Sequence, residues 1–158
     1  MKNYCRKIEN YFVKVRLCRY KVGSEVKNAK EAIAAVSKYV KDLDRENFIV
    51  LHLNARNVVV AIDQSSIGSE NAALISPSCV FRISLLCNAT SVILMHNHPA
   101  ASPVLSNAVA SNEDCKVTKR LIDAGRLLGV EVLDHIIVTG NDHYSFSENN
   151  KMGQEEKC

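Results

Sequence analysis

An uninterrupted apolar stretch that ends on two histidines constrains this chain more than any other feature. Residues 91–95 (SVILM) carry no charge and are followed at once by His96, Asn97, His98 and Pro99. Near-continuous apolar runs of this kind are typical of strands that are buried on both faces, in the middle of a sheet. Because alternate residues of a strand point to the same side, both histidines should emerge together where this strand ends.

A carboxylate follows a short distance along the chain. Ser111 and Asp114 stand three residues apart before apolar residues at helical spacing, so Ser111 should cap a helix and Asp114 should lie in its first turn. Taken alone, Asp114 would be interpreted as a capping-box acid. With His96 and His98 upstream, it completes a set of three metal ligands, the number that a catalytic Zn²⁺ takes from its protein.

A hydrolytic site would also need a general base, and sequence order alone does not choose it. The candidates are Glu46, Glu70, Glu113 and Glu131. Glu46 directly precedes a strongly apolar segment, residues 48–54, and therefore stands at the end of a predicted strand.

The remaining pattern predicts one α/β domain in which a mixed central sheet is flanked by helices. Its 158 residues are 47% hydrophobic and 23% charged, which is ordinary for a globular protein. We expect a flexible start at residues 1–10, the domain at 11–147 and a polar tail at 148–158. The periodicity predicts helices over about 28–41, 77–87 and 111–128, and strands at 11–22, 48–54, 58–63, 91–95, 130–139 and 144–147.

Composition narrows the location and partners. No apolar run approaches the roughly 20 residues of a membrane span, and the N-terminus lacks the apolar core of a signal peptide, so we expect a cytoplasmic protein with no membrane partner. The six cysteines are scattered without a Cys-x-x-Cys, which favours free thiols over a cysteine zinc site or a disulfide framework. The net charge of +3 is too small to argue for nucleic acid, although basic residues are concentrated in the first thirty positions.

Together these motifs resemble the JAB/MPN-domain family in its bacterial RadC-like branch. The shared features are a distant Glu46, the His96-Asn97-His98-Pro99 run, the Ser111 to Asp114 pair, Thr118, and GVEVLDHIIV at 129–138. This combination is the JAMM metalloprotease signature, and the resemblance covers roughly residues 28–146. It implies a single MPN/JAB domain with a cytidine-deaminase-like, three-layer arrangement.

The resemblance also implies roles for individual residues. His96, His98 and Asp114 would bind Zn²⁺, Glu46 would hold and deprotonate water, and Ser111 would stabilise an oxyanion. In the family, the usual spacing between the second histidine and the serine of the motif would place that serine at Ser106 instead of Ser111. The residue three positions after Ser106 is Val109, which cannot bind metal, so we interpret the longer loop as an insertion and leave open which serine faces the water.

Three further residues could support the ligands. Asn97 should point away from the metal and brace the loop. Asp134 and His135 could form a pair that orients the ligands, or they could be structural at the sheet edge.

The leading functional hypothesis is therefore a zinc-dependent metallopeptidase or isopeptidase acting on a peptide or isopeptide substrate. One alternative is a nucleic-acid-associated accessory protein, in line with the DNA-repair label of RadC-like proteins. Another is a non-catalytic MPN scaffold for partner binding. An uncovered strand edge at residues 11–22 would also permit a homodimer.

Overall fold

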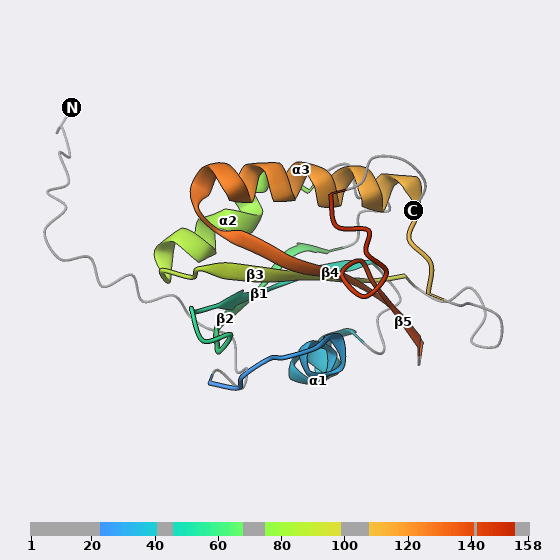
Figure 1. Ribbon diagram of the computed structural model, residues 1–158. Helices are drawn as coiled ribbons and strands as arrows, with labels where there is room; N and C mark the ends of the chain where they lie inside the picture. Colours follow the sequence, from blue (N-terminus) through green and yellow to red (C-terminus); the bar gives the residue numbers. More distant parts are fainter. Residues whose placement is uncertain (1–22, 41–45, 68–74, 99–107, 141, 154–158) are drawn as a thin grey trace, which may run out of the picture.

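A five-stranded mixed sheet lies between one helix on one face and two helices on the other (Figure 1). The computed structural model describes residues 23–40, 46–67, 75–98, 108–140 and 142–153. This three-layer α/β arrangement confirms the predicted fold class. In chain order the elements are α1 (Ala29–Val40), β1 (Asn47–Leu53), β2 (Val59–Ile67), α2 (Pro77–Leu86), β3 (Ser91–Asn97), α3 (Asn112–Leu128), β4 (Glu131–Thr139) and β5 (Asp142–Ser145).

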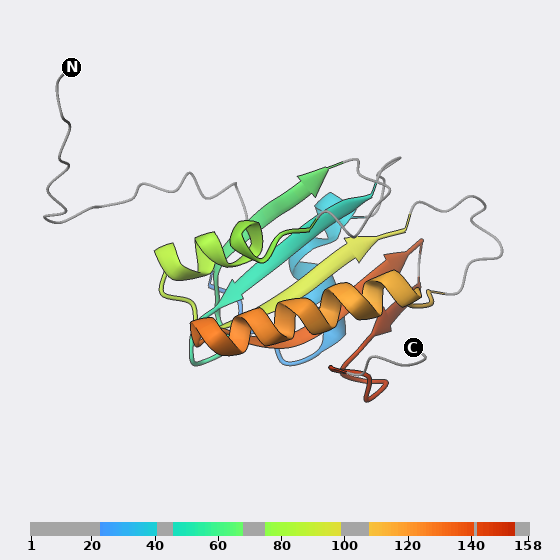
Figure 2. The same ribbon diagram turned by 90° about the horizontal axis from the view of Figure 1, so that it is seen from above.

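The strand that carries the two histidines, β3, is the middle strand of the order β2-β1-β3-β4-β5. It pairs antiparallel with β1 and parallel with β4, and every residue in it is buried. Helix α3 makes the crossover between the parallel strands β3 and β4 (Figure 2). The connectivity therefore brings three chain segments to one edge of the sheet: the end of β3, the start of α3 and the start of β1.

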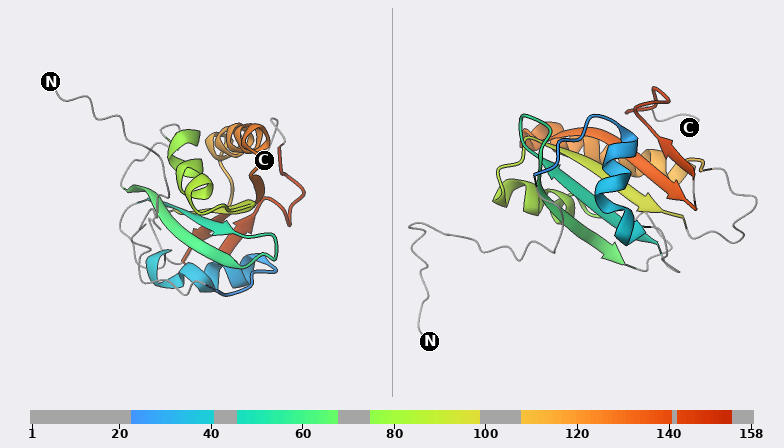
Figure 3. Two further views of the ribbon diagram at one scale, coloured as in Figure 1. Left: turned by 90° about the vertical axis from the view of Figure 1, so that its left-hand side faces the viewer. Right: turned by 90° about the horizontal axis from the view of Figure 1, so that it is seen from below.

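The two faces of the sheet build separate cores, because alternate residues of β1 point to opposite faces. Ile49 and Leu51 belong to the cluster on the α1 side, whereas Phe48 and Val50 pack with residues of α2 and α3. Figure 3 shows α1 across one face of the sheet and α2 and α3 across the opposite face. Burial on both faces explains why β1 and β3 are near-continuously apolar.

The helices bury less of their predicted apolar stripes than expected. Helical spacing in the sequence predicts that Leu85 and Leu128 face the core, but they are 52% and 44% exposed. Each lies in the last turn of its helix. Helical periodicity predicts which side of a helix points toward the sheet, but not how far along the helix the sheet extends. Gly125 lies against the backbone carbonyl of Val130, in the short connection between α3 and β4, and this close approach leaves no room for a Cβ.

Several other expectations have definite outcomes. Strand β2 extends four residues beyond the predicted 58–63, because its second half pairs with the start of β1. Cys79 and Cys87 are free thiols, but Cys115 is disulfide-bonded, so the expectation of six free thiols is wrong there. No helix in the described ranges has the length and apolar character needed to cross a membrane. The predicted strand at 11–22, with most of the basic N-terminal residues, lies outside the described residues.

Candidate metal centre

Three side chains that can bind a metal converge at the edge of the sheet where β3 ends. The Nε2 atoms of His96 and His98 lie 3.0 Å apart. Asp114 Oδ1 is 3.2 Å from His96 Nε2, and Asp114 Oδ2 is 3.7 Å from His98 Nε2. Among the described residues this is the one such group, with its ligand atoms all within 4.8 Å of one another. His96 and Asp114 are buried, whereas the side chain of His98 is 32% exposed and opens the cluster to solvent.

The spacing and chemistry of these atoms fit a zinc ion. Two ligands at 2.0–2.2 Å from one tetrahedral zinc lie roughly 3.3 Å from each other. His96 Nε2 lies close to that separation from both other ligand atoms, at 3.0 Å from His98 Nε2 and 3.2 Å from Asp114 Oδ1, and all three ligand atoms lie within 4.8 Å of one another. Two imidazoles and one carboxylate also form a donor set that catalytic zinc uses.

The first turn of α3 holds the Asp114 carboxylate in place. Ser111 donates to Asp114 Oδ2 from its backbone N–H (2.8 Å) and its Oγ (2.6 Å), and Asp114 N–H donates to Ser111 Oγ in return (3.2 Å). This is a complete capping box. Oδ2 is thus held by the cap, which leaves Oδ1 facing His96. The capping role and the ligand role, which seemed to be alternatives, are compatible in one residue.

Electrostatics favour the protonation states that bind metal. Burial by itself would raise the pKa of Asp114, but hydrogen bonds and charge from His96 and the Ser111 donors outweigh it and hold that pKa well below its usual value. Burial and the neighbouring His96 lower the pKa of His98, against an opposing effect of Asp114. The site thus favours an ionised carboxylate and a neutral imidazole at His98.

Behind the ligands, His135 connects to His96. The two rings meet through His135 Nε2 and His96 Nδ1, 2.9 Å apart, and His135 is completely buried. The neighbouring residue, Asp134, points to the other face of β4, where it accepts hydrogen bonds from Ser145 Oγ and the Ser147 backbone. Since consecutive strand residues face opposite sides, only His135 of this sequence pair reaches the ligands.

The other side of His135 contacts α3. Its Nδ1 lies 2.6 Å from Thr118 Oγ1, and that hydroxyl donates to the backbone carbonyl of Asp114, also at 2.6 Å. Thr118 is part of the family resemblance, but the sequence predicts no role for it in the site. A signal was present, since Thr118 stands one helical turn after Asp114, but its partner is brought in by the sheet from a different segment.

Glu46 lies at the same edge of the sheet. It directly precedes β1, and β1 pairs antiparallel with β3 so that Phe48 stands opposite His96. Strand alternation puts Glu46 on the Phe48 side and opposite His98. Asn97 points away from the ligands and accepts a hydrogen bond from the Asn47 backbone at 2.8 Å, which ties the two strand ends together.

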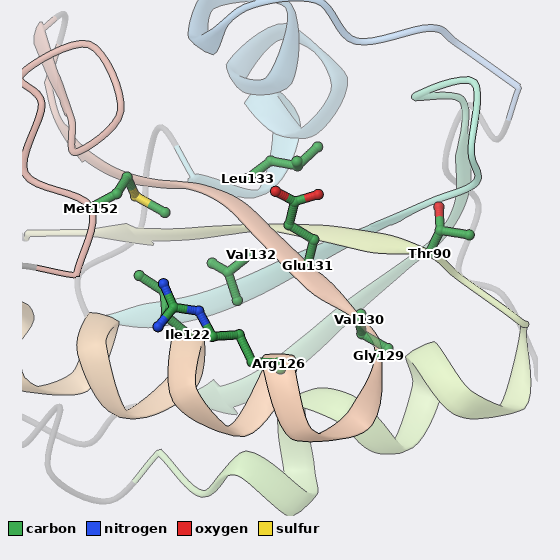
Figure 4. Close-up of a pocket in the computed structure, with 10 residues that line it drawn as sticks. Thr90, Ile122, Arg126, Gly129, Val130, Glu131, Val132, Leu133 and Met152 are labelled. Carbon is green, nitrogen blue, oxygen red and sulfur yellow. The ribbon is translucent and has the colours of Figure 1, made fainter.

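The other candidate bases are less well placed. Glu113 is exposed and forms an ion pair with Lys116 at 2.9 Å. Glu131 lies at the start of β4, at the far end of the sheet, where it lines a cavity of about 580 Å³ together with Arg126 and Met152 (Figure 4). Glu70 and the alternative serine, Ser106, lie outside the described residues.

The fold and the cluster together describe a mixed α/β domain with a three-ligand site at the end of its central strand. The sequence profile of RadC-like JAB domains matches residues 26–152. The chain therefore belongs to the family of RadC-like JAB domain proteins.

Similar curated relatives carry the name UPF0758 protein. Those from Alkaliphilus metalliredigens and Moorella thermoacetica are each 39% identical over 127 residues, which is 80% of this chain and 53% of the relative. The protein from Desulforamulus reducens is 41% identical over 112 residues, 71% of this chain and 47% of the relative. The chain thus spans about half the length of the curated relatives it matches.

Proposed function

We propose that this chain is a zinc-dependent hydrolase of the JAMM type that cleaves amide bonds in peptide or isopeptide substrates. The observation that carries the proposal is the convergence of His96, His98 and Asp114 at a solvent-accessible edge of the sheet. Membership of the RadC-like JAB family supports it. When bound, zinc would supply Lewis acidity, lowering the pKa of a coordinated water to about 7 and polarising a carbonyl.

The side chains around the cluster would share the remaining work. His96 and His98 would bind through Nε2, and Asp114 through Oδ1. Glu46 would take a proton from the attacking water with its carboxylate and pass it to the leaving amine. Ser111 donates its hydroxyl hydrogen to Asp114 Oδ2, so it would position that carboxylate, and it would have to rotate to donate to an oxyanion.

The first test separates metal binding from hydrolysis. The zinc content of the purified protein is measured, and hydrolysis of a fluorogenic isopeptide-linked substrate is followed with and without a chelator. We expect about one zinc per chain and chelator-sensitive hydrolysis. Glu46→Gln should keep the zinc and lose roughly 10²–10⁴-fold in rate, the usual contribution of a general base.

The matched control is Glu131→Gln, the same substitution at the far end of the sheet, which should change neither zinc content nor rate. A protein that binds no zinc would refute the proposal. A protein that binds zinc but hydrolyses no peptide or isopeptide bond would favour the non-catalytic scaffold. DNA binding that weakens with salt would favour the nucleic-acid accessory role instead.

A further inference from the structure

A chain of hydrogen bonds joins two of the three candidate ligands behind the site. It begins at the backbone carbonyl of Asp114, passes through the Thr118 hydroxyl and the His135 ring, and ends at His96 Nδ1. Its three links measure 2.6, 2.6 and 2.9 Å. All four residues are buried, with at most 5% of any of them exposed.

In the form that can bind metal, the hydrogen bonds of this chain can be donated in only one direction, from His96 towards Asp114. A carbonyl oxygen only accepts, so the single hydroxyl hydrogen of Thr118 is donated to Asp114. Thr118 Oγ1 must then accept from His135 Nδ1–H. A neutral His135 has no second hydrogen, so its Nε2 accepts from His96 Nδ1–H.

The consequence falls on the far nitrogen of His96. With its one hydrogen on Nδ1, the ring presents a bare lone pair at Nε2, the atom that lies 3.2 Å from Asp114 Oδ1 and 3.0 Å from His98 Nε2. The opposite direction would place a hydrogen on His96 Nε2 and aim it into the cluster, where it would block a metal.

We propose that His135 and Thr118 are positioning residues of the metal site, which hold His96 in the Nδ1–H tautomer and couple the strand that carries His96 to the helical turn that carries Asp114. The proposal rests on the metal site of the proposed function. Hydrogen bonds of this kind fix the orientation and basicity of a metal-binding histidine.

The surroundings hold His135 in a fixed pose. Its ring stacks on Phe146, with centroids 5.1 Å apart and planes 10° apart, and Phe48 packs at 5.6 Å on a tilted plane. The β3–β4 register places His135 next to Leu94, within two residues of His96. A ring held by aromatic neighbours loses little further freedom when it forms its hydrogen bonds.

Two substitutions break the chain at different links while keeping side-chain shape. Thr118→Val removes the hydroxyl, and His135→Phe removes both ring nitrogens. Zinc affinity is measured by competition with a chromophoric chelator. We expect each variant to bind zinc 10–100-fold more weakly than wild type, the usual effect of losing such a partner. Thr118→Ser, which restores a hydroxyl, should return affinity to within about threefold.

The same fold offers a matched control. His52 is also fully buried, and its Nδ1 lies 2.8 Å from the hydroxyl of Ser84 on α2, but this pair does not touch the cluster. Ser84→Ala and His52→Phe should therefore leave zinc affinity unchanged. If they weaken zinc binding as much as Thr118→Val does, the effect is general destabilisation and the positioning role is refuted.

A second readout follows the hydrogen bond between the two rings. In the zinc-free protein His96 Nε2 lies 3.2 Å from Asp114 Oδ1 and can donate a hydrogen to it, so the spectra are recorded on the zinc-loaded protein. Long-range ¹H–¹⁵N spectra then report whether His96 Nδ1 carries a hydrogen and how fast that hydrogen exchanges with water. We expect a slowly exchanging Nδ1–H in the wild type and a rapidly exchanging one in His135→Phe, with the Ser84→Ala spectrum unchanged. Variants that keep both the slow exchange and the zinc affinity would overturn the proposal. If the wild type itself binds no zinc, the proposed function fails, whereas tight zinc binding that the variants retain refutes only the positioning role.

Discussion

Helices α2 and α3 lie on the same face of the sheet and are built from similar parts, yet only one of them forms a site. Each follows a serine N-cap, and each contributes one buried hydroxyl to a buried histidine of the sheet: Ser84 to His52, and Thr118 to His135. On the α3 side, the second ring nitrogen of His135 contacts a candidate ligand. On the α2 side, the second nitrogen of His52 has no partner among the described residues.

This difference teaches that a buried histidine with a hydroxyl partner is not in itself a functional signal. What distinguishes His135 is the continuation of its hydrogen bonds into a cluster of groups with ligand chemistry. Substitutions on the α2 and α3 sides should therefore separate effects on stability from effects on metal binding. Four predictions test this comparison, from the largest expected effect to the smallest.

Loss of the carboxylate should abolish tight metal binding on the α3 side. Zinc sites with four ligands bind with about 10–16 kcal/mol, so one ligand accounts for roughly 3 kcal/mol, or more than a hundredfold in affinity. We expect at least that loss for Asp114→Asn in a chelator competition assay. Asp123→Asn, an exposed aspartate on the same helix, should bind zinc like the wild type, and equal losses in both variants would contradict the assignment.

On the α2 side, the buried His52 should make the free energy of unfolding depend on pH. Burial lowers the pKa of His52 to about 4, an effect that the charge of Asp63 only partly opposes. Because this folded value lies below the unfolded value of about 6.5, stability is complete above pH 6.5 and falls as pH drops towards 4. Between pH 7 and 4 the zinc-free wild type should lose about 3 kcal/mol more than His52→Phe, measured by urea unfolding. Parallel curves for the two proteins would show that His52 is not held neutral.

The two buried hydroxyls should matter equally for stability and unequally for zinc. Thr118→Val and Ser84→Ala each leave a buried ring nitrogen without its partner, which costs about 1–3 kcal/mol. Unfolding of the zinc-free proteins should therefore give similar losses for both variants. A loss confined to Thr118→Val would mean that the α2 pair contributes nothing to stability.

The two N-cap serines, Ser111 of α3 and Ser76 of α2, should show the smallest difference in their contribution to stability. Ser111 accepts the Asp114 N–H bond and completes a capping box, so Ser111→Ala should cost about 1 kcal/mol in the zinc-free protein. Ser76 makes no side-chain capping bond, and Ser76→Ala should stay within roughly 0.5 kcal/mol of wild type. Thermal unfolding of both variants measures the contrast, which would disappear if the two serines had equivalent roles.

The sequence predicts local features of the molecule better than relations between distant segments. The central position of β3 follows from its continuous apolar run, and the start of α3 follows from the Ser111 to Asp114 spacing, because both signals lie within a few residues. The burial of side chains at helix ends is predicted less accurately, as the exposed Leu85 shows, because it depends on how far the sheet extends beneath the helix.

The link between His135 and Thr118 could not be read from the sequence. It depends on the parallel register of β3 and β4, which sets His135 behind His96. Likewise, the position of Glu46 depends on the antiparallel pairing of β1 with β3 across about fifty residues. Such contacts come from sheet topology, for which a single sequence holds little information.

The most direct test of the metal centre is a crystal structure of the zinc-loaded protein, with anomalous diffraction recorded on both sides of the zinc absorption edge. We predict one zinc ion at the end of β3, with His96 Nε2, His98 Nε2 and Asp114 Oδ1 each about 2.0–2.2 Å away. An anomalous peak elsewhere in the molecule, or no peak at full zinc loading, would contradict the account.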